Sequence, residues 1–214
     1  VGERQKPVRY GEPVNGHLLV NDGRGVFEKA EELQEMFSSL GLITDSEWTD
    51  LDGDTWDDLV VVGEYMPVLV FKNLEGVIQS PVALTQNGWW NTVSVADLDG
   101  DGYKEIIAGN HGLNSRFRAS EQSPIVLFAE DFDSNGKIDP ILTQRVNGAH
   151  RPFALRHNLI DQIKELKKLF PDYESYRNVT IEGMFDEEVL KSSNRQSVEE
   201  LSSVVLWNEG SMNF

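Results

Sequence analysis

The sequence contains no cysteine among its 214 residues. Disulfide bonds, thiolate metal sites and a cysteine nucleophile are therefore excluded, while the redox compartment stays open. No run of 18 apolar residues occurs, so we expect no membrane span. A GxSxG elbow, a P-loop, a dinucleotide fingerprint and any zinc-binding pattern among the four histidines are also missing. We therefore expect a protein without enzymatic activity.

Positive charge is scarce. Lysine and arginine number 19 against 36 aspartates and glutamates, which gives a formal net charge of −17 at pH 7. Such a balance argues against nucleic acid or an anionic membrane as a partner. Hydrophobic residues make up 39% of the chain. A chain of this length and composition can bury a real core, as one large domain or two small ones.

Acidic residues gather in three stretches that share one spacing. The clearest is Asp97-Leu98-Asp99-Gly100-Asp101-Gly102-Tyr103-Lys104-Glu105, with carboxylates at loop positions one, three, five and nine. Related loops run over 50–58 and 131–139. Alternate residues of a tight loop turn toward one centre, and glycines at positions four and six let the backbone bend there. Carboxylates held so close together repel one another unless a cation lies between them.

Oxygen ligands on a flexible loop favour calcium, so we expect up to three calcium ions. An EF-hand would need a glutamate at position twelve, where this chain has Val61, Ala108 and Leu142. The alternative is three solvated acidic turns without metal. The predicted ligands are Asp50, Asp52, Asp54, Asp58 and the Trp56 carbonyl in the first loop, Asp97, Asp99, Asp101, Glu105 and the Tyr103 carbonyl in the second, and Asp131, Asp133, Asn135, Asp139 and the Lys137 carbonyl in the third.

Each acidic loop is predicted to connect two strands. The residues before and after the loops are apolar runs, such as Thr92–Ala96 and Ile106–Gly109 around the second loop. A second unit, a strand followed by Asn, Gly and an apolar return strand, recurs over 17–27, 68–78 and 204–214. A short helix is expected over 31–40. Apolar residues at helical spacing predict helices within 154–200, packed against the β structure.

In this chain the first two acidic loops are each followed by an apolar strand, which ends near Gly63 or Gly109. These motifs resemble FG-GAP/VCBS repeats. Together with the helical segment, the chain is similar to FG-GAP proteins related to the bacterial ASPIC/UnbV group. The resemblance implies a partial β-propeller, mainly β with a helical insertion, and integrin alpha-like calcium loops. It further implies a location outside the cytoplasm and a role in binding or adhesion.

The expected domain organisation follows from these repeats. Residues 1–16 form an irregular lead-in, 17–150 the propeller blades, 151–200 the helical insertion and 201–214 the start of a further blade hairpin. Within this scheme 43–80 and 92–144 are whole blades. Two blades and two fragments cannot close a ring of typical blade number, so we expect part of a longer protein. Exposed blade edges would allow association with a second copy.

Contacts with a ligand are expected from an aromatic pair and a polar loop. Trp89 and Trp90 could stack on a sugar or a partner side chain at the mouth of a propeller. His111 and Arg116 follow the second blade and could contact an acidic ligand. The competing interpretation packs both tryptophans between the blades and makes the loop an ordinary connection.

The sequence therefore predicts a calcium-binding propeller segment of an extracellular, periplasmic or cell-surface protein. The first residues, Val1-Gly2-Glu3-Arg4-Gln5-Lys6, are not expected to be a signal peptide. The predicted segment would act in adhesion or recognition of a protein or glycan ligand. The alternatives are a carbohydrate-binding module and an accessory domain of a larger polysaccharide-processing protein.

Overall fold

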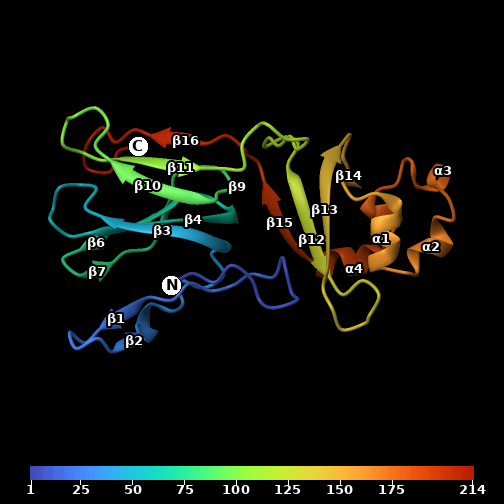
Figure 1. The fold of residues 1–214 in the computed structure, drawn as a ribbon, viewed down its shortest axis with the longest axis horizontal. Helices are drawn as coiled ribbons and strands as arrows, with labels where there is room; N and C mark the ends of the chain where they lie inside the picture. Colours follow the sequence, from blue (N-terminus) through green and yellow to red (C-terminus); the bar gives the residue numbers. More distant parts are fainter. The chain divides into compact units, whose positions relative to one another are not determined.

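A computed structural model describes residues 1–214, which divide into two compact units. Unit 1 comprises Val1–Arg4, Pro13–Phe117 and Glu200–Phe214, and unit 2 comprises Gln5–Glu12 and Arg118–Glu199. Each unit contains antiparallel β-sheet, and unit 2 also contains the α-helices (Figure 1). None of the helices has the length and apolar character needed to cross a membrane. The predicted class, mainly β with a helical part, is confirmed, whereas no closed propeller ring is present.

The first sheet of unit 1 is a four-stranded meander with one additional short strand. Its order is β3-β4-β5-β8, and β9 pairs with the far end of β4. All nine residues of β4 are buried, as expected for a strand that is apolar on both faces. The bounds are Leu42–Thr49 for β3, Asp58–Met66 for β4, Leu69–Phe71 for β5, Val82–Ala83 for β8 and Gly88–Trp89 for β9.

The second sheet of unit 1 has the order β10-β11-β16. It consists of β10 (Thr92–Ala96), β11 (Glu105–Gly109) and β16 (Val204–Leu206). The prediction that 201–214 begins a further blade is therefore corrected, because β16 pairs with β11 as the third strand of this sheet. The apolar sequence Val204–Leu206 predicts a strand, but its partner β11 lies too far away in the sequence for local patterns to identify it.

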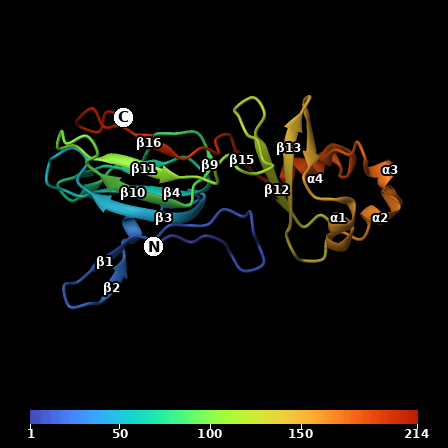
Figure 2. The same ribbon diagram turned by 45° about the horizontal axis from the view of Figure 1, so that its top comes forward.

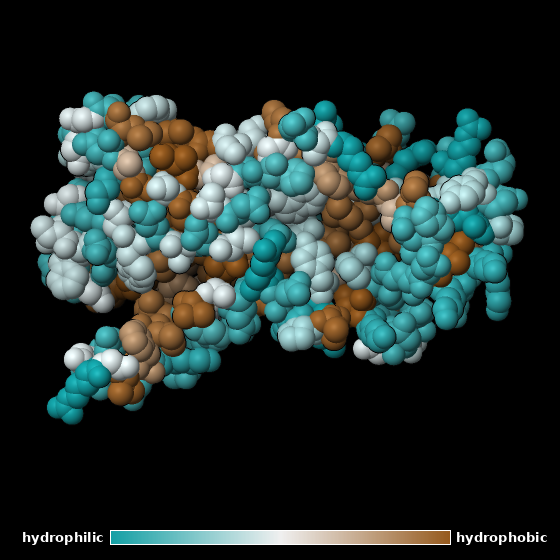
Figure 3. All heavy atoms as spheres, in the orientation of Figure 1, coloured by the Kyte–Doolittle hydropathy of each residue, from teal (hydrophilic) through white to brown (hydrophobic).

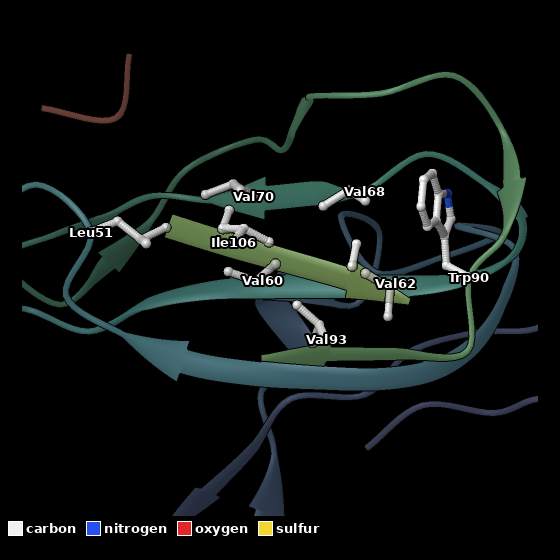
Figure 4. Packing of buried hydrophobic residues seen from close by; sticks show 9 residues of the cluster. Leu51, Val60, Val62, Val68, Val70, Trp90, Val93 and Ile106 are labelled. Atoms are coloured by element: carbon white, nitrogen blue, oxygen red, sulfur yellow. The ribbon is translucent and has the colours of Figure 1, made fainter. Parts of the chain in front are cut away.

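The two sheets of unit 1 pack face to face around one core. Figures 1 and 2 both show β10 and β11 lying against β3 and β4. Close up, side chains of the two sheets point toward one another between the strands (Figure 4). Val60, Val62 and Ile106 are completely buried there, together with Trp90. Burial of such side chains contributes about 1.5–3 kcal/mol each.

The opposite face of the first sheet is covered by residues near the N-terminus of the chain. Phe37 stacks on Phe71 at 4.7 Å between ring centroids, and Ile43 and Leu59 join this second cluster. The helix expected over 31–40 is reduced to the 3-10 helix η1 (Glu31–Leu33), followed by turns. The apolar residues of this segment pack in or against the cluster, although the backbone turns after η1 and does not continue as a helix.

Two hairpins complete unit 1. One joins β6 (Asn73–Leu74) to β7 (Val77–Ile78), and the other joins β1 (Leu19–Asn21) to β2 (Phe27–Lys29). Every residue of β1 and β2 is exposed. Figure 3 shows apolar brown spheres on this hairpin at the lower left. A two-stranded hairpin is only marginally stable in water on its own.

Unit 2 contains a sheet of order β14-β13-β12-β15. The third acidic loop joins β12 to β13 here, so the expectation that 92–144 forms one blade is corrected: its second half belongs to a different sheet. The helical insertion predicted over 151–200 also supplies a strand, β15, which pairs with β12. The strand bounds are Ile125–Glu130 for β12, Asp139–Val146 for β13, Ala149–Pro152 for β14 and Asn194–Val198 for β15.

Short helices cover one face of this sheet. Leu159, Leu166 and Leu190 from the helices pack with Val126 and Phe128 of β12. The amphipathic segment therefore lies against β structure, as predicted, but breaks into separate turns at Ile163 and Phe170. The helices are α1 (Arg156–Gln162), α2 (Leu166–Leu169), α3 (Tyr173–Tyr176), the 3-10 helix η2 (Ile181–Gly183) and α4 (Glu187–Ser192).

Shortening Ile106 tests the core between the two sheets of unit 1. We expect Ile106→Ala to lower the free energy of unfolding by about 2–5 kcal/mol, because it opens a cavity at a fully buried position. The neighbouring Ile107 is only half-buried and faces the other side of β11, so Ile107→Ala should cost clearly less. Urea denaturation followed by tryptophan fluorescence measures both. Equal losses would contradict this packing.

Candidate metal sites in three acidic loops

All three acidic loops connect neighbouring antiparallel strands. The first joins β3 to β4, the second β10 to β11 and the third β12 to β13. Each strand pair begins or ends directly at its loop, since Thr49 faces Asp58, Ala96 faces Glu105 and Glu130 faces Asp139. The predicted strand–loop–strand arrangement is confirmed. The first two loops belong to unit 1 and the third belongs to unit 2.

The backbone follows the same course in each loop. Positions four and six adopt positive φ angles in all three: 80° and 75° in the first loop, 82° and 93° in the second, and 57° and 86° in the third. The second loop places glycine at both positions, whereas Thr55 and Ser134 are side-chain-bearing residues in this left-handed region. Such residues carry backbone strain. The glycines at positions four and six of the sequence motif thus mark the two places where the loop backbone has positive φ angles.

The side chains at position one fold back onto the loop. Asp50 accepts hydrogen bonds from the backbone N–H groups of Gly53 (2.8 Å) and Thr55 (2.9 Å). Asp97 accepts from Gly100 (2.7 Å) and Gly102 (3.1 Å) in the same way. In the third loop, Asp131 accepts from positions five and six, at 2.8 and 2.7 Å. The side-chain oxygens at positions three and five each accept a hydrogen bond from the backbone N–H of the residue two positions further along the chain.

The carboxylate at position nine closes each loop from inside. Asp58 and Glu105 are completely buried and Asp139 is 3% exposed. Each accepts a hydrogen bond from the backbone N–H of the second loop residue, at 3.1 Å from Leu51, 2.6 Å from Leu98 and 3.2 Å from Phe132. The position-nine acid is therefore a structural part of the loop as well as a predicted metal ligand.

Burial affects the loop acids differently. Burial raises the pKa of Asp58, and the negative charges of Asp52 and Asp54 raise it further. Two hydrogen bonds from backbone N–H groups lower this pKa, but the net shift is upward. Burial likewise raises the pKa of Asp139. Burial also raises the pKa of Asp50, but hydrogen bonds from backbone N–H groups outweigh it, and the pKa is lowered. A cation among these groups would stabilise the ionised form of the buried acids.

The structure brings three acidic side chains together in each loop, with ligand oxygens within 4.8 Å of one another. The predicted carboxylates Asp54 and Glu105 lie outside these groups. An all-oxygen donor set with buried carboxylates fits calcium better than zinc or copper. The carbonyl groups of Trp56, Tyr103 and Lys137 stay predicted ligands, as does the Asn135 amide oxygen. The groups are Asp50, Asp52 and Asp58; Asp97, Asp99 and Asp101; and Asp131, Asp133 and Asp139.

Glu105 differs from the other two position-nine acids. Its Oε2 accepts the bond from Leu98, but its buried Oε1 has no hydrogen-bond partner. A buried carboxylate oxygen without a partner is costly. This carboxylate lies outside the acidic group of its loop, whose three grouped aspartates are all exposed.

Sequence reasoning missed three residues that contact the loops from the following strands. Lys72 forms an ion pair with Asp52. Asn73 donates from its side chain to the carbonyl at position eight of the first loop (3.0 Å), and Asn208 donates to the equivalent carbonyl of Lys104 in the second loop (3.3 Å). The signal was present in the sequence, because both asparagines occupy the same place in the repeated strand–Asn–Gly unit.

The predicted ligand contacts of the two tryptophans are corrected. Trp90 is completely buried and Trp89 is 9% exposed, so neither presents a ring face to a ligand. Trp89 packs edge-on against Tyr65, His111 and Phe117 at 5.2–6.0 Å. The competing interpretation, packing in the core, describes both. His111 and Arg116 remain exposed beside this aromatic cluster, with the Arg116 guanidinium 5.3 Å from the Phe117 ring.

The comparison with protein families finds one match. Residues 50–108 match the family model of an FG-GAP-like repeat. The match begins at Asp50, the first predicted ligand of the first loop, and ends in β11. It therefore includes both acidic loops of unit 1 and the strands between them. The third loop lies outside it. No curated protein and no solved structure matches the chain significantly.

Removing the buried acid of the first loop tests its role as a ligand. We expect Asp58→Asn to weaken calcium binding at this loop about tenfold or more, because calcium affinity depends on the ligand charge count. Asp57→Asn removes the same charge from the exposed neighbouring residue and should leave the affinity unchanged. Isothermal titration calorimetry measures both variants, with circular dichroism to confirm that each is folded. Equal weakening would show a general charge effect.

Proposed function

We propose that this chain is a calcium-binding, propeller-like segment of a secreted or cell-surface protein. We further propose that it acts in adhesion or ligand recognition without catalysis. The observation that carries the proposal is the threefold repetition of one loop geometry, with clustered carboxylates and a buried acid at position nine. Two of these loops lie within the FG-GAP-like repeat.

A bound calcium ion would supply positive charge among carboxylates that otherwise repel one another. Asp50, Asp52 and Asp58 would hold it in the first loop, and the corresponding acids in the other two loops. Each loop connects two paired antiparallel strands, so a cation there would brace the connection between them. The proposed ions are structural: they would stabilise the surface that recognises a partner.

The exposed hairpin β1–β2 supports a role in recognition. Val20 and Val26 are each 55% exposed and Phe27 is 60% exposed, on a hairpin whose strands pair only with each other. Exposed apolar side chains and free strand edges favour contact with a protein partner or with a second copy of the chain. The alternative of a carbohydrate-binding module loses its main support because Trp89 and Trp90 are buried. An accessory role in a larger polysaccharide-processing protein remains a second proposal.

Chelation tests the structural role of calcium. Adding EGTA should lower the melting temperature by about 5–10 °C, because ions that bind only the folded loops contribute about 2–3 kcal/mol at a hundredfold excess over Kd. Differential scanning calorimetry with and without calcium measures the shift, and magnesium at the same concentration provides the control. An unchanged melting curve in EGTA would rule out structural calcium.

Recognition of a glycan can be separated from protein–protein contact. A glycan array probed with and without calcium should show no calcium-dependent sugar binding if the partner is a protein. Light scattering at several concentrations then tests association through the exposed hairpin. We expect Phe27→Ser to reduce any such association, since Phe27 is the most exposed large apolar residue of this hairpin. Strong sugar binding would instead favour the carbohydrate-binding alternative.

A further inference from the structure

Unit 2 contains a cavity of about 300 Å³ next to the turn between β13 and β14. Its apolar lining residues include Phe128 and Leu190. Three of its lining residues carry a positive charge, which is unusual in a chain with a net charge of −17. The charged and titratable residues of the lining are Arg145, His150, Glu182, Glu187, Lys191 and Arg195.

The sheet register explains why two arginines meet here. Arg145 of β13 lies opposite His150 of β14, and Arg195 of β15 lies opposite Phe128 of β12. Phe128 also faces Ile141, which is four residues before Arg145 on β13. Because side chains two and four residues apart share a face of a strand, both arginines and the histidine lie on one face of the sheet. This is the face that the helices of unit 2 cover.

The two arginines are held differently. The Arg195 guanidinium stacks over the Phe128 ring, 5.0 Å from its centroid, and donates to the Leu190 carbonyl at 2.5 and 3.2 Å. The Arg145 guanidinium makes no hydrogen bond or ion pair with the chain, so its donors are free for a ligand. Lys191 is already paired with Glu187 at 2.6 Å. One hydrogen-bonded and one unpaired guanidinium therefore border the same cavity.

His150 adds an imidazole group to the lining of the same cavity. Burial lowers the pKa of its imidazole, and the charges of Arg145 and Arg195 lower it further, while Glu182 opposes this shift. The backbone N–H of His150 donates to both carboxylate oxygens of Glu182, at 3.2 and 3.3 Å. A neutral imidazole can donate to or accept from a ligand.

We propose that this cavity binds a small oxyanion, a carboxylate or phosphate group, between the guanidinium groups of Arg145 and Arg195. Guanidinium groups hold both kinds of oxyanion in a bidentate manner. The lining acids Glu182 and Glu187 can accept hydrogen bonds from hydroxyl or amino groups in the rest of the ligand. The volume fits a molecule of monosaccharide or amino-acid size. Most of the negative charge lies on unit 1, while the charges of unit 2 are nearly balanced.

The site is independent of the acidic loops, so it can be tested whether or not calcium binds. The full ¹⁵N-labelled chain is titrated with sodium glucuronate, with inorganic phosphate and with uncharged glucose, and amide shifts are followed by NMR. We expect at least one of the two anions to shift the amides around Arg145, His150 and Arg195, while glucose does not. The anion that binds identifies the carboxylate or the phosphate as the ligand group. Failure of both anions, or equal binding of glucose, overturns the proposal.

A matched pair of variants then locates the site. Arg145→Gln should weaken anion binding roughly tenfold to a hundredfold, since it removes a charged hydrogen-bond donor. Arg151→Gln removes the same charge from β14 at a position paired with Gln144, on the opposite face of the sheet, and should bind like the parent chain. Unchanged shifts of distant amides confirm the fold of each variant. Equal weakening in both, or none in Arg145→Gln, overturns the proposal.

Discussion

The buried carboxylate at position nine is the constraint on which each acidic loop depends. It accepts the N–H of the second loop residue, and thereby ties the end of the loop to its beginning, next to the first paired residues of two strands. Burying a charged group is unfavourable unless its oxygens find donors or a cation. The residue that closes the turn is therefore a buried carboxylate that a cation would stabilise. The aspartates around it add further negative charge. In the first and third loops, where this acid belongs to the acidic group, loop closure and the proposed cation binding depend on the same side chain.

The third strand of each sheet in unit 1 is tied to the loop of that sheet. Asn73 contacts the first loop from the segment after β5, and Asn208 contacts the second loop from the segment after β16. Asn208 also donates to the carbonyl of Leu51 at 2.8 Å, so it connects the two loops of unit 1. The two sheets are thus linked by polar contacts at their loop ends as well as by the apolar core between them.

Local patterns predicted much of this structure. The strand–loop–strand units follow from alternating acids beside apolar runs, and the positive φ angles follow from the spacing of glycines such as Gly100 and Gly102. Pairing over long distances was not predictable: the sequence around Val204 does not reveal that it pairs with β11, because register depends on tertiary contacts. The ion pair between Lys72 and Asp52 also depends on tertiary structure, so local sequence patterns do not predict it. The tryptophans show that an aromatic pair alone does not distinguish a core from a binding surface.

The insertion of unit 2 between β11 and β16 affects how unit 1 folds. β11 ends at Gly109 and β16 begins at Val204, so closing this sheet joins residues far apart in the chain, and such contacts form slowly. Within unit 2, Ile125 near its entry pairs with Val198 near its exit. Once unit 2 has folded, the long connection behaves as a short one, and the entropy lost on pairing β16 falls. A substitution that unfolds unit 2 would therefore weaken the second sheet of unit 1 through chain entropy, without changing any of its side chains.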